Sequence, residues 1–174
     1  LHQVLKVRPG ETVLVHAAAG GVGSTAVQLA RYSGARVIGA ARESGQEHIR
    51  ALGGEPVVYG PDLADQVRAV APGGVDAAFD ILGGDFLQGT PTLLAPGGRL
   101  ASIADGGVTD LGGTYAFTRA DAADLATLAG LAEQKTLTVA VARTFPLERT
   151  ADAHRFAEAG GTGGRVVVTV GGNG

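Results

Sequence analysis

"VHAAAGGVGSTAVQLA", residues 15–30, sets three glycines between an apolar run and an amphipathic run. Glycine inside a strand or a helix is destabilising by roughly 0.5–1 kcal/mol relative to alanine, so we expect the turn between the two runs to need it. Gly20 and Gly23 match the last two glycines of G-x-G-x-x-G, with Ala18 at the first position. Between a strand and a helix, this spacing is typical of a dinucleotide-binding turn.

Short β-branched runs alternate with alanine- and leucine-rich runs around and beyond this turn. The β-branched runs are apolar throughout, as in strands that are covered on both faces. Strands and helices in this alternation predict an α/β fold with a doubly wound parallel sheet, a three-layer αβα Rossmann fold. The expected strands are 12–16, 36–40, 56–59, 75–80 and 99–103, and the expected helices are 22–33, 44–52, 62–71 and 85–94.

The rest of the chain is less regular. Residues 112–117 are a candidate sixth strand at the edge of the sheet, and the tail after Val170 is expected to be disordered. The other expected elements are a helix at 120–133, a β-rich segment at 137–145, a helix at 147–159 and a closing strand at 164–170.

The glycine turn is the candidate site for a pyrophosphate. The backbone N–H groups of Gly21 and Val22 would face the anion, and a side chain at Gly20 would obstruct its approach. The positive end of the helix dipole favours the same position. Gly23 would let the helix pack closely on the strand. The candidate pyrophosphate-binding residues are Ala19, Gly20, Gly21, Val22 and Gly23. The alternative is that the glycines only allow close packing and bind no ligand.

The end of the second strand is expected to distinguish NADPH from NADH. An acidic residue there would accept hydrogen bonds from a ribose 2′-hydroxyl, but Ala41 occupies the position and Arg42 follows it. An arginine can donate charge-assisted hydrogen bonds to a 2′-phosphate, so the sequence favours NADPH. Glu43 could serve a ribose hydroxyl and favours NADH instead, and Arg42 could also be a solvated loop residue.

Two further strand ends are expected to contact the cofactor. In an open α/β sheet, ligands lie beyond the carboxyl ends of the strands, at the switch point between the first and the fourth. Asp80 could be a ligand contact, or could cap a helix or bond to its own loop. The candidates are Ile81, Leu82 and Gly83 beside the ribose and adenine, and Ser102, Ile103 and Ala104 nearer the nicotinamide.

No catalytic acid or base can be named from the sequence. We expect His16 to be a hydrogen-bonded histidine at a strand end rather than a proton donor. Ser24 and Thr25 open a helix and are expected to cap it. Asp121 and Asp124 stand at the start of another helix, where they favour its dipole.

Composition excludes several classes of function. The formal net charge is -3 with scattered basic residues, which disfavours nucleic acid as a partner. No apolar run approaches the ~20 residues that cross a bilayer, so no membrane is expected. There is no cysteine, and the histidines show no metal-binding spacing, so no metal is expected. With no secretory signal, a cytoplasmic location is expected. A chain that starts at Leu1 and lacks methionine is interpreted as a processed product or an excised piece.

Four stretches together resemble the zinc-independent quinone oxidoreductase branch of the medium-chain dehydrogenase/reductase superfamily. The first is "PGETVLVHAAAGGVGSTAVQLARYSGARVIGAAR" (9–42), and the second and third are "GGVDAAFDILGG" (73–84) and "LLAPGGRLASIAD" (93–105). The fourth is "VARTFPLERTADAHRFAEAGGTGGRVVVTV" (141–170). The resemblance implies NADPH-dependent reduction of a quinone, enone or similar activated double bond, with hydride leaving the nicotinamide.

The resemblance also implies a domain organisation. Residues 9–134 would be the NAD(P)-binding Rossmann domain, and 1–8 would be the end of a connecting helix. A GroES-like catalytic domain would precede Leu1 and supply most of the substrate cleft, and 135–174 would return to it. This chain alone is therefore expected to be inactive. The zinc-using members of the superfamily carry their ligands mainly in that other domain, which again predicts no metal here.

Tyr59 matches a tyrosine that lies beside the 2′-phosphate in this branch, although it could be an ordinary aromatic at a strand end. The lysine usual after the second strand is not found, since Gln46 and Glu47 stand nearby. This difference weakens the assignment of NADPH unless Arg42 replaces the lysine.

Other functions and partners stay open. One alternative is a nucleotide-binding or redox-sensing module without catalysis, and another is the enoyl reductase unit of a polyketide or fatty-acid synthase. The superfamily commonly dimerises through edge strands, so a homodimer through 114–117 is a further hypothesis.

Overall fold

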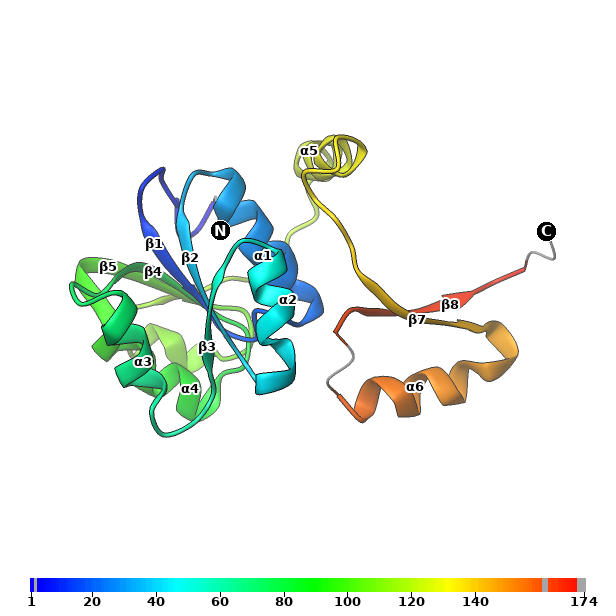
Figure 1. Cartoon of the computed structure of the whole chain (residues 1–174). Coiled ribbons are helices and arrows are strands. Elements are labelled where there is room, and N and C mark those ends of the chain that lie inside the picture. The colour runs from blue at the N-terminus through cyan, green and yellow to red at the C-terminus, as the bar shows by residue number, and fades with distance from the viewer. Residues whose placement is uncertain (2, 161–162, 172–174) are drawn as a thin grey trace.

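Six parallel strands form the main sheet of the computed structural model, which describes residues 1, 3–160 and 163–171 (Figure 1). Their order is β3-β2-β1-β4-β5-β6. Strands β2 and β3 follow on one side of β1, and β4, β5 and β6 follow on its other side. The predicted doubly wound sheet and its switch point between the first and fourth strands are confirmed. The strands are β1 Thr12–Val15, β2 Arg36–Ala41, β3 Glu55–Val58, β4 Val75–Asp80, β5 Leu94–Ser102 and β6 Thr114–Tyr115.

Helices cover both faces of this sheet. Helices α1 (Gly21–Tyr32) and α2 (Gln46–Ala51) lie on one face, and α3 (Leu63–Val70) and α4 (Gly84–Gly89) lie on the other (Figure 1). The result is the expected three-layer α/β/α arrangement. Short 3₁₀ turns connect several elements: η1 Glu43–Gly45, η2 Thr90–Leu93, η3 Gly106–Thr109 and η4 Leu147–Arg149.

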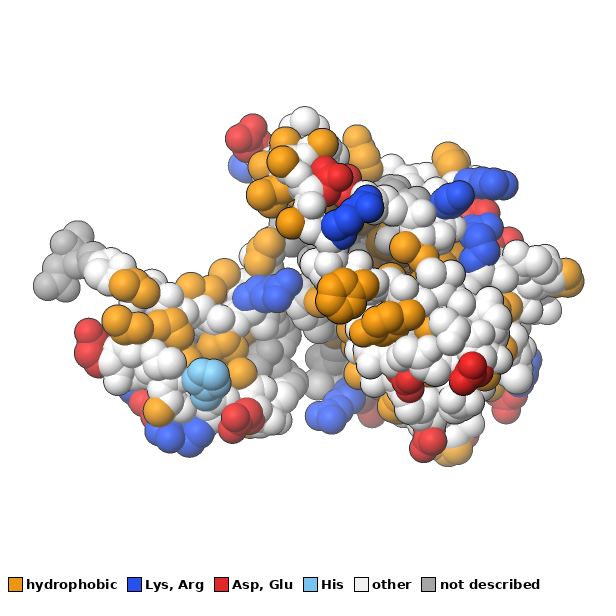
Figure 2. All heavy atoms as spheres, turned by 180° about the vertical axis from the view of Figure 1, so that it is seen from behind, with side chains coloured by type: hydrophobic (Ala, Val, Ile, Leu, Met, Phe, Trp, Pro, Cys, Tyr) orange, Lys and Arg blue, Asp and Glu red, His pale blue; other side chains and the backbone are white. Residues whose placement is uncertain are grey.

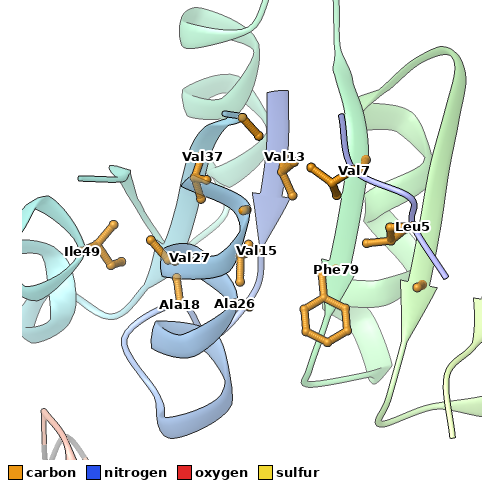
Figure 3. Packing of buried hydrophobic residues seen from close by; sticks show 14 of the residues in the cluster. Leu5, Val7, Val13, Val15, Ala18, Ala26, Val27, Val37, Ile49 and Phe79 are labelled. Atoms are coloured by element: carbon orange, nitrogen blue, oxygen red, sulfur yellow. The ribbon is translucent and has the colours of Figure 1, made fainter. Parts of the chain in front are cut away.

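The strands separate two apolar clusters. Along β1, Val13 and Val15 point to the cluster that contains Val27 of α1, whereas Leu14 points to the opposite cluster. Leu5 and Val7, from the segment before β1, extend the first cluster to Phe79 at the end of β4 (Figure 3). Successive residues of a strand point to opposite faces, and burial on both faces explains why the runs are apolar throughout.

The helix expected at 85–94 is shorter than predicted. Helix α4 ends at Gly89, and η2 follows with Pro91 near its start. Proline has no N–H to donate to the helical ladder, which limits continuation of the α-helix. Strand β5 then begins at Leu94 rather than at Arg99 and includes a register shift, because the segment at 96–98 contains a proline and two glycines.

Two terminal predictions need correction. The described residues of 1–8 form a turn at 3–5 instead of the end of a helix, and Lys6 has φ +49, which a helix cannot contain. The edge strand expected at 112–117 is only Thr114–Tyr115, paired parallel to β5. The tail predicted to be disordered lies, at 172–174, outside the described residues.

The C-terminal part forms a separate β-α-β unit. Strands β7 (Val141–Pro146) and β8 (Arg165–Thr169) pair in parallel, with α6 (Thr150–Glu158) packed on them. Figure 1 shows this unit to one side of the six-stranded sheet, connected to it through α5 (Ala122–Glu133). The expected strands and helices of this region are confirmed, with the first strand starting later than predicted. Asp121 caps α5 by accepting from the N–H groups of Ala123 and Asp124.

The substitution Gly23→Ala should be strongly destabilising. A Cβ at this position would lie 2.0 Å from the carbonyl oxygen of Ala17, so backbone would have to move. We expect the free energy of unfolding, measured with urea, to fall by about 3 kcal/mol.

Gly130→Ala is the matched control, because a Cβ at Gly130 in α5 would have no neighbour within 4 Å. That substitution should raise the free energy of unfolding by up to about 1 kcal/mol, since alanine is the better helix former. Similar stabilities for the two variants would contradict the close packing of α1.

Candidate functional site

The turn between β1 and α1 is held in an unusual conformation. Ala17 has φ +48, a left-handed conformation that costs a residue with a side chain roughly 1–2 kcal/mol. Its N–H donates to the Tyr59 hydroxyl at 2.5 Å, and its carbonyl accepts from the N–H of Gly20 at 2.9 Å. The N–H of Ala18 donates to Ala40 at the end of β2. These bonds lead the chain out of the sheet and directly into α1.

The first amides of α1 are open. The helix begins after Gly20, and among the described residues no side chain caps it. The first N–H groups of a helix lack partners inside the helix and carry the positive end of its dipole, so they can bind an anion. Gly20 is exposed, and Val22 is 43% exposed. The structure therefore brings the predicted glycine-turn residues together at a surface that an anion can reach.

Ser24 and Thr25 do not cap α1, so this prediction is wrong. Both lie one turn inside the helix, and their hydroxyls donate back to the carbonyl oxygen of Gly21 at 3.4 and 3.2 Å. Hydroxyl side chains inside a helix commonly bond to the carbonyl three or four residues earlier. The amides of the first turn consequently stay free of both side chains.

Arg165 of β8 reaches the same turn. Its Nη2 donates to the carbonyl oxygen of Gly21 at 3.1 Å, and a Cβ on Gly21 would lie 2.7 Å from the guanidinium carbon. Gly21 thus leaves room for a cation from a segment 144 residues away. Arg165 was not predicted from the sequence, because spacing along the chain carries no sign of this contact.

A cavity of about 430 Å³ continues from the glycine turn past the ends of β2 and β3. It contains both side chains that were predicted to recognise a 2′-phosphate, Arg42 and Tyr59. The C-terminal unit also borders it: a Cβ on Gly160 would lie 3.6 Å from Nη1 of Arg42. The lining residues are Ala17, Ala19, Gly20, Ala41, Arg42, Ser44, Gly45, Tyr59, Leu82, Phe86, Gly160 and Gly163.

Figure 2, which views the molecule from behind, shows a notch between the larger lobe and the C-terminal unit, with basic side chains on its borders. In the cavity itself, burial raises the pKa of Tyr59 to about 12, so its hydroxyl keeps its proton. That oxygen accepts the N–H of Ala17, and its own O–H stays available to donate. The cavity therefore combines a cation with a neutral hydroxyl donor.

Asp80 shapes the loop that follows β4. Its buried carboxylate accepts from the N–H groups of Leu82 and Gly83 and from the Ser102 hydroxyl, the last at 2.6 Å. Gly83 has φ +72, which suits a glycine. Of the two roles predicted for Asp80, the structure shows the loop-bonding one.

The remaining predicted contacts lie at these strand ends. Leu82 lines the cavity, whereas Ile81 and Ile103 pack against the apolar cluster on the α1 face. The Ser102 hydroxyl also accepts from the N–H groups of Ala104 and Asp105, so its hydrogen-bonding capacity is used within the protein. A cofactor contact by Ser102 would have to come from its backbone.

His16 is fully buried where β1 ends. Its Nε2 lies 3.0 Å from the Thr90 hydroxyl, and its ring is parallel to that of Tyr59 at 6.3 Å. Burial lowers the pKa of His16, an effect that the nearby Asp80 charge partly offsets. The prediction of a hydrogen-bonded strand-end histidine is confirmed.

The described residues contain no group of three or more histidine, aspartate or glutamate side chains that could hold a metal ion. None of the helices in the described part of the chain is long and apolar enough to span a membrane.

The chain is similar to known proteins in both sequence and structure. The family described as zinc-binding dehydrogenase matches residues 52–168. The 2-haloacrylate reductase of Burkholderia sp is 35% identical over 193 residues, covering 97% of this chain and 58% of the reductase. The spectinabilin polyketide synthase protein NorB of Streptomyces orinoci is 33% identical over 181 residues, covering 94% of this chain and 8% of NorB.

Solved structures of similar proteins superpose on nearly the whole chain. An NAD-dependent alcohol dehydrogenase superposes with a TM-score of 0.84 at 34% identity, over 96% of this chain and 53% of that one. The quinone oxidoreductase from Coxiella burnetii superposes with a TM-score of 0.83 at 30% identity, over 96% of this chain and 55% of that one. The chain thus spans little more than half the length of these proteins, and a far smaller share of NorB.

Protonation of His16 should destabilise the fold. Folding lowers the pKa of His16 from its ordinary value of 6.5. As the pH falls, His16 is therefore protonated in the unfolded chain before it is protonated in the folded chain, which favours unfolding. We expect the free energy of unfolding to fall as the pH drops from about 7.5 to 5.5.

His16→Gln should flatten this pH dependence, and His154→Gln, at an exposed position of α6, should leave it as in the wild type. Denaturant titrations at a series of pH values measure both. If the free energy of unfolding of His16→Gln changed with pH as steeply as that of the wild type, the pH dependence would come from other groups.

Proposed function

Because the chain belongs to the zinc-binding dehydrogenase family of the medium-chain dehydrogenase/reductase superfamily, we propose that it is the NADPH-binding part of a reductase. The reductase would deliver hydride to a quinone, an enone or a similar activated double bond. The observation that carries this proposal is the open first turn of α1, continuous with a cavity that holds Arg42 and Tyr59. An anion site beside a cavity that contains a cationic side chain fits the two charged parts of NADPH.

The diphosphate would bind at the glycine turn. The N–H groups of Gly21 and Val22 would donate to its oxygens, and the absence of a Cβ at Gly20 would let it approach the backbone. Arg165 would add a positive charge from the C-terminal unit, since its guanidinium already lies against Gly21. Gly23 would contribute indirectly, by allowing α1 to begin this close to Ala17.

The adenosine end would occupy the cavity. Arg42 would pair with the 2′-phosphate, and Tyr59 would donate its hydroxyl hydrogen to a phosphate or ribose oxygen. Ala19 and Leu82 line the same cavity and would contact the ribose and the base, together with the backbone of Gly83. This arrangement uses Arg42 in place of the lysine that the quinone oxidoreductase branch carries.

The nicotinamide end would lie near Ile103 and Ala104, beyond the end of β5. When bound, the reduced nicotinamide supplies the hydride. The chain's own contribution would be to hold the ring: the Asp80–Ser102 hydrogen bond joins the ends of β4 and β5 and keeps both loops in place. The family description implies zinc, but the described residues offer no set of ligands that fits it, and we assign no metal-dependent step.

The substrate class follows from the relatives. A haloacrylate and a quinone each contain a carbon–carbon double bond conjugated to a C=O group, which withdraws electrons and makes the conjugated system an acceptor of hydride. We infer that the whole protein reduces a small molecule of this kind, and that residues beyond these 174 complete the substrate cleft. A homodimer through the edge segment 114–117, which contains β6, is also proposed; Tyr115 and Phe117 of this segment are 41% and 84% exposed.

A second candidate function is an enoyl reductase unit within a polyketide synthase. The similarity to NorB, of which this chain would be 8%, favours it. Such a unit would keep the same nucleotide site and would differ in its substrate, which a carrier protein would deliver. Carrier-protein or ketoreductase domains in the same reading frame would distinguish this candidate from a free-standing reductase.

The preference for NADPH should depend on Arg42. Calorimetric titration of the wild type should show tighter binding of NADPH than of NADH. Arg42→Ala should weaken NADPH binding at least about tenfold and leave NADH binding nearly unchanged, because the lost hydrogen bonds join charged groups. Arg68→Ala in α3, which removes an exposed arginine outside the cavity, serves as the control. A wild type that prefers NADH would overturn the assignment.

The chain by itself should bind NADPH without efficient turnover. In a stopped-flow assay with a quinone or an enone, we expect slow oxidation of the bound NADPH, since one wall of the substrate cleft is supplied from elsewhere. Turnover of the purified chain at the rate of an ordinary reductase would show that these 174 residues already contain the complete active site.

A further inference from the structure

Two aromatic rings contribute to the apolar side of the cavity. Tyr59 and Phe86 lie with their ring centroids 4.6 Å apart and their planes tilted by 49°. Phe86, on α4, is 39% exposed, whereas the next residue, Leu87, is fully buried in the core. Helix α4 is thus anchored by Leu87, and the ring of Phe86 contributes to the cavity instead of the core.

The position of Phe86 is fixed through two buried polar side chains. The Thr90 hydroxyl donates to the carbonyl oxygen of Phe86 at 2.7 Å. A hydroxyl has one hydrogen, so the bond between Thr90 and His16 must use the hydrogen on Nε2 of His16. This chain of bonds connects the end of α4 to the end of β1, and the His16 ring also lies 6.3 Å from the rings of both Tyr59 and Phe86.

A cavity that contains both an exposed aromatic ring and a cation is suited to a purine nucleotide. Purines stack on aromatic faces, and the 2′-phosphate of the same nucleotide requires a positive charge nearby. The cavity offers both, with Phe86 and Arg42 among its lining residues. The sequence analysis had assigned only aliphatic or glycine neighbours to the adenine.

We propose that the ring of Phe86 stacks on the adenine of the bound nucleotide and that Thr90 is the positioning residue that holds it there. This inference rests on the proposed function, because it assigns a residue within the same nucleotide site. It extends that function by predicting that the base, and not only the phosphates, contributes to affinity.

The test separates the two ends of the cofactor. Adenosine 2′,5′-bisphosphate carries the base and both phosphates of the adenosine end, and reduced nicotinamide mononucleotide carries the other end. Phe86→Leu keeps an apolar side chain on α4 but removes the aromatic face. We expect it to weaken binding of the bisphosphate about fivefold or more, with mononucleotide binding changed less than twofold.

Tyr32→Leu is the matched control, since it removes an aromatic ring at the far end of α1 that is 60% exposed and does not line the cavity. It should change neither affinity. The adenine protons of the bisphosphate should also shift upfield in NMR spectra with the wild type and lose much of that shift with Phe86→Leu. Unchanged bisphosphate affinity and unchanged adenine shifts in Phe86→Leu would overturn the stacking role.

Thr90 is tested by two substitutions. Thr90→Val removes the hydroxyl at nearly constant shape and should weaken the bisphosphate with little effect on the mononucleotide, and Thr90→Ser should restore the affinity. Equal losses for both ligands, or a serine variant no better than valine, would overturn the positioning role. A wild type that binds neither ligand would refute the proposed function itself, which distinguishes that failure from a failure of this inference.

Discussion

The first turn of α1 runs so close to the end of β1 that residue 23 has no room for a side chain. A Cβ on Gly23 would overlap the carbonyl oxygen of Ala17, and Ala17 itself has a left-handed conformation that the Tyr59 hydroxyl stabilises. This close approach aims the open amides of α1 at the surface beyond the sheet. The candidate anion site, the cavity beside it and the orientation of α1 on the apolar cluster all depend on this close approach.

Two arginine side chains, from distant parts of the chain, lie at this candidate site. Arg42 follows β2, and Arg165 begins β8 in the C-terminal unit. Each lies beside a glycine of the other part: Arg42 near Gly160 and Arg165 against Gly21. The C-terminal unit, which the sequence had linked only to a separate catalytic domain, therefore also borders the proposed nucleotide site. Its two contacts flank the positions proposed for the diphosphate and the 2′-phosphate.

Much of the fold was predictable because it is encoded locally. The apolar β-branched runs identified the strands to within a few residues, and the glycine spacing identified the turn that forms the candidate site. Predictions failed where contacts between distant segments override the conformation that the local sequence favours. Strand β5 starts early despite Pro96, because pairing with β4 supplies its partners. Ser24 and Thr25 resemble caps by composition, but helix α1 begins too far ahead of them.

By itself the sequence determined the doubly wound sheet, the glycine turn and the location of Arg42 and Tyr59 at strand ends, since each depends on neighbours along the chain. Only the tertiary structure decided that Arg165 meets Gly21 across 144 residues and that Thr90 joins His16 across 74. It also decided that Phe86 faces the cavity. Contacts of this kind depend on how separate elements pack, and no spacing within one segment records that geometry.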